Sequence, residues 1–365
     1  MKPFEVGVIS VVPSPYQRDI FRAMAASPEI SLKVYYLEAA APDSPWPEEP
    51  LQPYEMILRG RYVSVAGNRF HVVTEHPNLR ECRAVILNNL TSSLAQYLLR
   101  SNIQDRKLLF WGEALRDQGS NTRRLIQHFV AGRLRNVSAI VAIGTEAEKS
   151  YRLRFPSVPI YNIPYHCNLQ PFMDRQASFD RSRSAVRFLF CGQMIARKGV
   201  DILVRAFDLL IRKGLDAELI LTGREADLEK ILQQIPDSTK QKISYEGFSD
   251  PKNLPQFFSR ADVFVLPSRY DGWGVVINQA IGAGLPVICS DAVGAGYDLV
   301  ESGRNGFRVP AGEVDRLASA MESFITQPNL LAEFGQRSSE IARHWTPEKG
   351  ARRWVTVLST LFNNI

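Results

Sequence analysis

Cysteine is scarce in this chain of 365 residues. The four cysteines, Cys82, Cys167, Cys191 and Cys289, lie far apart, and none belongs to a C-x-x-C pair. Zinc sites and disulfide frameworks use closely spaced cysteines, so the sequence disfavours both. Cys191 and Cys289 end short apolar runs, which predicts free thiols that fill core positions in a reducing compartment.

Long apolar runs are also missing. No uncharged stretch approaches the roughly 20 residues that cross a bilayer, and the apolar residues 6–12 are too short for a secretory signal. We therefore expect a cytoplasmic protein that at most binds the inner face of the membrane. The formal charge of +6 suits an anionic substrate or a membrane surface but is too small to indicate a nucleic-acid partner.

Several common catalytic motifs are absent. The first apolar run leads into Pro13-Ser14-Pro15 and not into G-x-G-x-x-G, which disfavours a dinucleotide-dependent dehydrogenase. The sequence has neither a G-x-x-x-x-G-K-[ST] phosphate loop nor an H-E-x-x-H motif, which argues against a P-loop kinase and against a metal site built by the protein. We expect no metal ligands.

What the sequence does contain is an alternation of short apolar runs with helical patterns, in both halves. Runs rich in β-branched residues that lead into helix-start signals are typical of parallel strands buried on both faces. The runs cover residues 6–12, 32–37, 84–87, 107–111 and 139–143 in the first half, and 188–191, 219–221, 263–266 and 287–289 in the second. The prediction is an α/β fold with two doubly wound parallel sheets.

A proline-rich stretch separates the halves. Four prolines between residues 156 and 171, followed by a polar segment at 175–187, mark the boundary. We predict an N-terminal domain of residues 1–170, joined by a C-terminal helix at 347–365, and a C-terminal domain of residues 185–345. Ligands of such sheets bind at the carboxyl ends of the strands, so we expect the site in a central cleft that both domains face.

The first candidate site follows the first strand of the second domain. That run ends at Gly192-Gln193, and Arg197-Lys198 then precede a helical pattern. Two adjacent cations after the carboxyl end of a strand suit a diphosphate ligand. The alternative is a solvated pair on the first turn of the helix, but the helix macrodipole disfavours cations there, so a bound anion explains the pair better.

The second candidate site is the loop after residues 263–266. Its residues are Asp271, Gly272, Trp273, Gly274 and Val275, and a helical pattern starts at the last two. Glycine lets a ligand approach the backbone closely, and free N–H groups at the start of a helix bind anions. Asp271 would hold sugar hydroxyls and Gln279 ribose hydroxyls; the alternative for Asp271 is a loop cap.

Together these stretches resemble the retaining nucleotide-sugar glycosyltransferases of family 4, which have the GT-B fold. Members of that family carry G-R-x-x-x-x-K-G before a helix, and E-x7-E inside P-S-x-x-E-G-x-G-x-x-x-x-E-A. Here these read Gly192-Gln193…Lys198-Gly199 and Pro267-Ser268…Asp271-Gly272…Gly274…Gln279-Ala280. The resemblance also includes Leu221-Thr222-Gly223 and Tyr245-Glu246-Gly247-Phe248, and it covers the second domain. It implies two Rossmann-like domains.

Three positions depart from the family pattern. Gln193 replaces the usual arginine, so its phosphate role would pass to Arg197. Asp271 is one methylene shorter than the usual glutamate, and Gln279 is neutral where a second glutamate is usual. Because an amide still accepts from and donates to ribose hydroxyls, we expect weaker or altered nucleotide binding.

The resemblance implies transfer of a hexosyl residue from a nucleotide diphosphosugar to a hydroxyl of a glycan or lipid-linked glycan, as in polysaccharide or lipopolysaccharide biosynthesis. Configuration would be retained, without a metal or other cofactor. Arg197 and Lys198 would stabilise the leaving diphosphate, and Asp271 would hold the transferred sugar. The donor would lie against Gly192, Gln193, Gly223, Phe248, Gly272, Trp273, Gly274, Val275 and Gln279.

The first domain would supply the acceptor side. Candidates at predicted strand ends are Tyr16, Arg18, Asn88, Asn89 and Glu113. We expect Glu113 to take part in catalysis; the alternative is a salt bridge with Arg116. The five histidines lie at no predicted strand end, and we interpret them as structural or surface residues.

A basic helical pattern covers residues 123–135. Four arginines alternate with an apolar stripe there, which suits a helix on anionic lipid or on a lipid-linked acceptor. The alternative is a core-facing helix with a solvated basic face.

Two other functions remain open. Gln193 and Gln279 make a non-catalytic nucleotide-sugar-binding protein an alternative. A nucleotide-sugar epimerase of the GT-B type is another, although its chemistry would want acid/base carboxylates and a histidine in the cleft.

Overall fold

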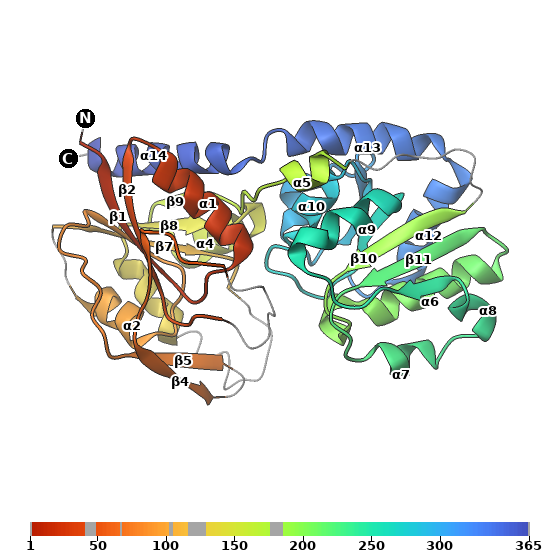
Figure 1. Cartoon of the computed structure of the whole chain (residues 1–365), viewed down its shortest axis with the longest axis horizontal. Coiled ribbons are helices and arrows are strands. Elements are labelled where there is room, and N and C mark those ends of the chain that lie inside the picture. Colours follow the sequence, from red (N-terminus) through yellow and green to blue (C-terminus); the bar gives the residue numbers. More distant parts are fainter. Residues whose placement is uncertain are drawn as a thin grey trace. The chain divides into compact units, whose positions relative to one another are not determined.

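The computed structural model describes residues 2–40, 49–65, 68–101, 105–115, 129–175 and 185–363. The chain forms two compact units, one of Met1–Cys167 with Pro347–Ile365 and one of Asn168–Thr346 (Figure 1). The C-terminal segment therefore belongs to the first unit. Among the helices in these ranges, none is long and apolar enough to cross a membrane.

The first unit is built on a seven-stranded sheet whose neighbouring strands are all parallel. Its order is β3 (Glu55–Ile57), β2 (Ile30–Tyr36), β1 (Phe4–Ser10), β6 (Ala84–Leu87), β7 (Lys107–Gly112), β8 (Ala139–Ala142) and β9 (Ile160–Asn162). Val6, Val8 and Ile9 of β1 are completely buried, as expected for a strand that helices cover on both faces.

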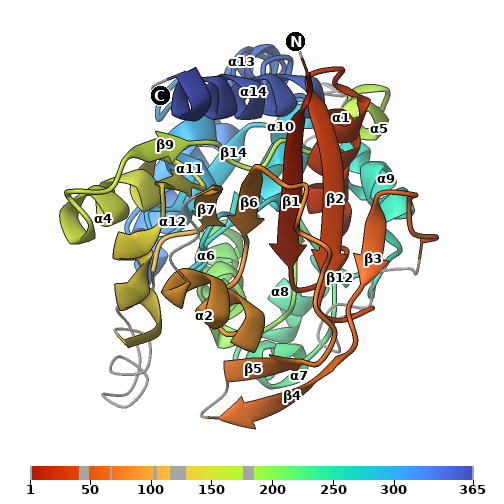
Figure 2. The same cartoon turned by 90° about the vertical axis from the view of Figure 1, so that its left-hand side faces the viewer.

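Helices of the first unit include the one that closes the chain. They are α1 (Pro15–Ala26), α2 (Ser93–Arg100), η1 (Gly132–Asn136), α4 (Thr145–Arg154) and α14 (Pro347–Asn363). α14 lies beside α1 (Figures 1 and 2). A Cβ atom at Gly350 of α14 would come within 2.9 Å of both His166 and Ile20, so glycine permits this close packing. Trp354 anchors α14 by packing edge-on against Trp111 at 5.6 Å between ring centroids.

A separate hairpin, which the sequence analysis did not predict, joins β3 to β6 of the first unit. β4 (Gly60–Val65) and β5 (Asn68–Val73) pair antiparallel and lie outside the main sheet. Every residue of β4 is exposed, whereas His71 of β5 is buried.

The second unit contains a six-stranded parallel sheet. Its order is β12 (Ile243–Tyr245), β11 (Ala217–Thr222), β10 (Val186–Cys191), β13 (Val263–Leu266), β14 (Val287–Ser290) and β15 (Gly306–Val309). The accompanying helices are α5 (Gln170–Met173), η2 (Ala196–Lys198), α6 (Val200–Arg212), α7 (Leu228–Leu232), α8 (Asp237–Lys240), η3 (Pro251–Asn253), α9 (Leu254–Arg260), α10 (Val276–Gly282), α11 (Ala295–Leu299), α12 (Val314–Thr326) and α13 (Asn329–Ala342).

These two sheets confirm the predicted α/β class with two Rossmann-like parallel-sheet domains. The prediction of free, buried cysteines is also confirmed. Burial raises the pKa of Cys191 and of Cys289 to about 12, so both thiols stay protonated and unreactive near neutral pH.

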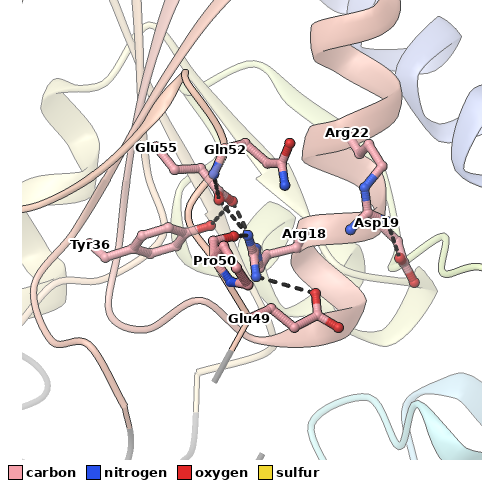
Figure 3. Close-up of polar contacts among 8 residues, drawn as sticks. All are labelled: Arg18, Asp19, Arg22, Tyr36, Glu49, Pro50, Gln52 and Glu55. Carbon is pink, nitrogen blue, oxygen red and sulfur yellow. Dashed lines mark hydrogen bonds and ion pairs between the residues drawn. The ribbon is translucent and has the colours of Figure 1, made fainter. Parts of the chain in front are cut away.

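A buried ion pair ties α1 to the edge of the first sheet (Figure 3). The Arg18 guanidinium donates from Nε to Oε1 of Glu55 at 3.0 Å and from Nη2 to Oε2 at 2.6 Å. Both side chains are almost completely buried. The Tyr36 hydroxyl (2.8 Å) and the Gln52 N–H (2.8 Å) also donate to the Glu55 carboxylate.

α1, β2 and the turn before β3 thus converge on one carboxylate. Burial alone would lower the pKa of Arg18, but its hydrogen bond to Glu55 and the charge of Glu55 outweigh burial and raise it. The guanidinium stays charged, and the hydrogen bonds of the pair replace the lost hydration.

We predict that Glu55→Gln lowers the free energy of unfolding by about 3–5 kcal/mol, because the change leaves the Arg18 charge buried without a counterion. Chemical denaturation measures the loss. Lys33→Met is the matched control, since it breaks the exposed ion pair of Lys33 with Glu81 (2.7 Å) and should cost far less. Equal losses in the two variants would show that the buried Arg18–Glu55 pair contributes no more to stability than the exposed Lys33–Glu81 pair.

His166 is a second buried polar group of the first unit, under α14. Its ring Nδ1 lies 2.8 Å from the carbonyl oxygen of Pro164. Burial, with a smaller contribution from the charges of Arg353 and Lys349, lowers the pKa of His166 to about 4. The residue is structural, in line with the sequence interpretation of the histidines.

This shift predicts acid destabilisation. An unfolded histidine takes up a proton near pH 6.5, whereas folded His166 does so only near pH 4. His166 therefore adds no pH dependence to stability above about pH 6.5. As the pH falls from about 6.5 to about 4, the free energy of unfolding should decrease by about 1.4 kcal/mol per pH unit. A His166→Gln variant should lack this component. Parallel pH–stability curves for the wild type and the variant would contradict it.

Candidate active site

The candidate donor site lies at the carboxyl ends of the strands of the second sheet. Because all strands are parallel, the loops after β10, β11, β12 and β13 leave the sheet at the same edge. Open parallel sheets bind ligands at this edge. The predicted donor residues lie on these loops: Gly192, Gln193, Arg197 and Lys198 after β10, Gly223 after β11, Phe248 after β12, and Asp271, Gly272, Trp273, Gly274 and Val275 after β13.

Lys198 and Asp271 meet directly. Nζ of Lys198 lies 2.5 Å from Oδ2 of Asp271, and both side chains are mostly buried. Arg197 donates from Nη1 to the carbonyl oxygen of Tyr270 at 3.0 Å. The two cations and the aspartate, predicted on separate loops, therefore form one cluster.

The helix argument for a bound anion, however, does not hold. Arg197 and Lys198 belong to the 3-10 turn η2, which Gly199 separates from α6. They therefore precede the first turn of α6, and both cations have partners within the chain, so a bound anion is not needed to explain them. Asp271 and the Tyr270 carbonyl oxygen are their partners within the chain.

A second ion pair holds the same two loops together. The Arg269 guanidinium binds both carboxylate oxygens of Asp201, each at 2.7 Å, and also donates to the carbonyl oxygen of Ala196. Burial would raise the pKa of Asp201, but hydrogen bonding to Arg269 and the charges of Arg269 and Arg205 outweigh burial and lower it. Such bidentate pairs are geometrically specific, so η2 and the loop after β13 are fixed against each other.

Gly199 makes this close approach possible. Its φ is +73°, and a Cβ atom there would lie 2.1 Å from the carbonyl oxygen of Pro267. Only glycine fits such a position without moving the backbone of the neighbouring loop.

A similar contact joins the ends of β10, β11 and β12. A Cβ atom at Gly223, whose φ is +133°, would lie 2.1 Å from the carbonyl oxygen of Gly192. The Gly223 N–H donates to Gly247 at 2.9 Å, which brings the segment before Phe248 against the same edge. Phe248 is half exposed (51%) and so offers a free aromatic face. Gln193, next to Gly192, is half-buried.

The loop after β13 packs on the loop after β14. The Asp271 N–H donates to Ala292 at 3.0 Å, and a Cβ atom at Gly294 would lie 2.2 Å from the carbonyl oxygen of Gly272. The Trp273 side chain is buried, and its Nε1 donates to Asn278 at 2.8 Å. Trp273 thus builds the core under the loop, and only its backbone is available to a ligand.

Gln279 of α10 is the other departure from the family pattern. It is half-buried, and within the described part of the chain its Oε1 atom is buried without a hydrogen-bond partner. A buried acceptor without a donor is costly, and a ligand hydroxyl would satisfy it.

The first unit has a polar network at the corresponding edge of its sheet. Gln17 donates from Nε2 to Oδ1 of Asn88 at 2.7 Å, and Ser10 at the end of β1 donates to both. The Tyr165 hydroxyl is hydrogen-bonded to the side chains of Gln17 and Glu113. Two predicted acceptor-side residues, Asn88 and Glu113, therefore share one network.

Sequence reasoning missed Ser10, Gln17 and Tyr165 of this network. Ser10 and Gln17 flank the Pro13-Ser14-Pro15 loop at the end of the first strand, so their position could have indicated them. Nothing in the sequence distinguishes Tyr165. Burial, and next the charge of Glu113, raises the pKa of Tyr165 well above its ordinary value, so its hydroxyl remains a donor.

The remaining acceptor-side candidates are Arg18, Tyr16 and Asn89. Arg18 was the wrong choice, because Glu55 holds its guanidinium in the buried pair of Figure 3. Tyr16 packs edge-on against Tyr165 at 4.9 Å between ring centroids. Asn89 is buried and donates to the carbonyl oxygen of Ile9 at 3.4 Å.

Two sequence predictions fall partly outside the described residues. Arg116, the alternative partner of Glu113, belongs to the undescribed residues 116–128. So does the first part of the basic pattern 123–135, residues 123–128. The structure describes residues 129–135, which end within the 3-10 turn η1.

A family model matches part of the second unit. Residues 185–327 match the family model of the glycosyl transferases group 1. The match covers the loops after β10, β11, β12 and β13, which carry the clustered residues. The second unit is therefore similar to the glycosyl transferases group 1.

Individual relatives are similar over part of the chain. The chain is 24% identical over 221 residues to an alpha-D-kanosaminyltransferase of Streptomyces kanamyceticus, across 57% of this chain and 56% of that relative. The chain thus spans little more than half the length of the first curated relatives it matches.

Solved structures share the fold over the whole chain. A sucrose-phosphate synthase from Thermosynechococcus elongatus superposes with a TM-score of 0.76 at 20% identity, covering 99% of this chain and 100% of that one. HepE of Anabaena, solved in complex with UDP, has a TM-score of 0.71 at 16% identity, covering 98% and 100%. At these identities the likeness shows the GT-B fold alone.

We predict that Gly199→Ala destabilises the protein more than Gly214→Ala does. Both glycines have positive φ (+73° and +76°), but a Cβ atom meets the Pro267 carbonyl only at Gly199 and open space at Gly214. The difference in free energy of unfolding should be about 1–3 kcal/mol, because the loops after β10 and β13 must separate. Thermal and chemical denaturation test it; equal losses would mean that the loops are not held at that contact.

Proposed function

We propose that this protein transfers a hexosyl residue from a nucleotide diphosphosugar to a hydroxyl of a glycan or lipid-linked glycan, with retention of configuration and without a metal or other cofactor. The observation that carries the proposal is the cluster of Arg197, Lys198 and Asp271 at the carboxyl edge of the second sheet. Two similar proteins, a kanosaminyltransferase and a protein solved in complex with UDP, support a nucleotide-sugar donor.

The reaction follows from the charges in the cluster. The bond between the anomeric carbon and the diphosphate oxygen breaks, and its electron pair stays on the diphosphate. Arg197 and Lys198 stabilise that charge, together with the N–H groups of residues 272–275. The acceptor hydroxyl oxygen bonds to the anomeric carbon on the face that the diphosphate leaves, and its proton passes to the departing phosphate oxygen.

Asp271 has a separate part in this proposal. Without a donor it neutralises Lys198. A bound diphosphate offers Lys198 a stronger anionic partner, and Asp271 then accepts hydrogen bonds from hydroxyls of the transferred sugar. Gln279, whose Oε1 atom has no donor in the described part of the chain, would accept from a ribose hydroxyl, and Phe248 would lie against the base.

The acceptor side belongs to the first unit. We assign it to the network of Asn88, Gln17, Tyr165 and Glu113, which presents amide, hydroxyl and carboxylate groups suited to sugar hydroxyls. Glu113 is the charged member of this network and the residue that we expect to contribute to catalysis.

We predict that Lys198→Met lowers kcat/KM for sugar transfer by about a hundredfold or more, because the leaving diphosphate loses a cation in the transition state. The donor is first found by thermal shift with a panel of nucleotide diphosphosugars that differ in base and sugar. Lys213→Met is the matched control, since it breaks the lysine–carboxylate pair with Glu322 (2.6 Å) at the other end of α6. Near-normal transfer by Lys198→Met would overturn the assignment.

Four further measurements test the role of Asp271, the retention of configuration, the independence from metals and the turnover itself. Asp271→Asn should lose much of the rate while still binding free nucleotide diphosphate. The anomeric configuration of the product, read by nuclear magnetic resonance, tests retention. Loss of activity with a chelator would contradict metal independence, and donor binding without any turnover would favour a nucleotide-sugar-binding protein.

A further inference from the structure

Three segments of the first unit lack acidic residues. No aspartate or glutamate occurs at residues 56–74, 82–104 or 118–145, although each segment contains arginines. With 38 acidic residues among 365, stretches of this length ordinarily contain about two each. One segment without acidic residues would be unremarkable. Three such segments matter only if they lie together in the fold.

The described parts of the three segments lie side by side. α2 occupies the middle, with the β4–β5 hairpin on one side (Figure 2). Oγ of Ser93 on α2 accepts from the N–H of Val73 on β5 at 3.0 Å. On the other side, Asn136 of η1 donates to the carbonyl oxygen of Leu99 at 3.0 Å, and Arg133 bonds Gln96. The fold thus joins three acid-free segments into one region.

The outer residues of this region are apolar and basic. Val63 and Val72 of the hairpin are 57% and 51% exposed, and Tyr97 and Phe129 are 62% and 66% exposed. Arg61 and Arg100 are exposed beside them. Arg61 pairs with Val72 across the hairpin, and side chains alternate along β4, so Arg61, Val63 and Val72 share one face. We call Arg61, Val63, Val72, Tyr97, Arg100 and Phe129 the acid-free surface.

This combination of side chains fits one kind of partner. Exposed apolar groups set among arginines match the headgroup region of an anionic bilayer. Two carboxylates contact the hairpin segment, but the Glu38 side chain is mostly buried and contacts Arg69 and His71, and Glu75 accepts from the Arg59 N–H. A second copy of the chain would bring arginines against arginines. A soluble polyanion would pair with the arginines but leave the two valines, the tyrosine and the phenylalanine in water.

We propose that the acid-free surface docks the protein on anionic phospholipid. The arginines bind lipid phosphates, while the exposed aliphatic and aromatic side chains enter the interface between headgroups and acyl chains. This surface adds the β4–β5 hairpin and α2 to the expected membrane contact at 123–135. It does not depend on the proposed sugar transfer, since vesicle binding is measured without donor or acceptor.

The test is sedimentation of the full chain with vesicles. We expect binding to vesicles of equal parts phosphatidylglycerol and phosphatidylcholine, weaker binding as salt is raised, and little binding to phosphatidylcholine alone. Arg61→Gln with Arg100→Gln should weaken binding by about 25-fold, since each cation at an anionic surface contributes about fivefold. Arg316→Gln with Arg352→Gln removes the same charge from exposed helix positions elsewhere and should leave binding unchanged.

A second pair of variants tests the apolar part. Val63→Ser with Val72→Ser keeps every charge and should still weaken vesicle binding, without changing binding to a soluble polyanion such as heparin. The proposal is overturned if the wild-type chain ignores anionic vesicles, if the control pair loses as much as the Arg61 and Arg100 pair, or if binding is confined to the soluble polyanion. Circular dichroism and melting confirm that each variant is folded.

Discussion

The ion pair between Lys198 and Asp271 is the interaction on which the donor site depends. The two residues are 73 positions apart, and their contact requires that the loops after β10 and β13 touch. Adjacent parallel strands bring the loops to one edge, Gly199 removes the Cβ atom that would separate them, and Arg269 fixes them through Asp201. Residues from the loop after β10, from α6 and from the loop after β13 thus hold one lysine and one carboxylate in place.

The polar groups at the carboxyl edges of the two parallel sheets differ in charge. In the second unit, Lys198 and Asp271 neutralise each other, so an incoming diphosphate can replace the aspartate as partner of Lys198. In the first unit, the network of Ser10, Gln17, Asn88 and Tyr165 is neutral except for Glu113. A charged edge suits a charged leaving group, and a largely neutral one suits sugar hydroxyls.

Much of the fold was predictable because the central strands are fully buried. β6 and β13 are wholly apolar, and β1, β10 and β14 each contain a short buried apolar run, as expected for strands of parallel sheets. The short edge strands β3 and β12 and the exposed β4–β5 hairpin carry no such run, so their residues do not reveal them. The sequence also indicated that Lys198 and Asp271 serve one ligand. Their direct contact could not be predicted, because it depends on loop packing.

Arg18 shows why residue type and position along the chain are not enough to assign a site. It follows the first strand, as Lys198 follows the first strand of the second unit, and the sequence offers both as binding cations. Arg18 meets a carboxylate on a neighbouring edge strand that also accepts from Tyr36 and Gln52, so both charges are saturated and buried. Lys198 meets a carboxylate on a loop, at the edge of the sheet where ligands bind. A cation can serve a ligand only where its partner in the chain can be exchanged, and this condition separates the structural arginine from the candidate catalytic lysine.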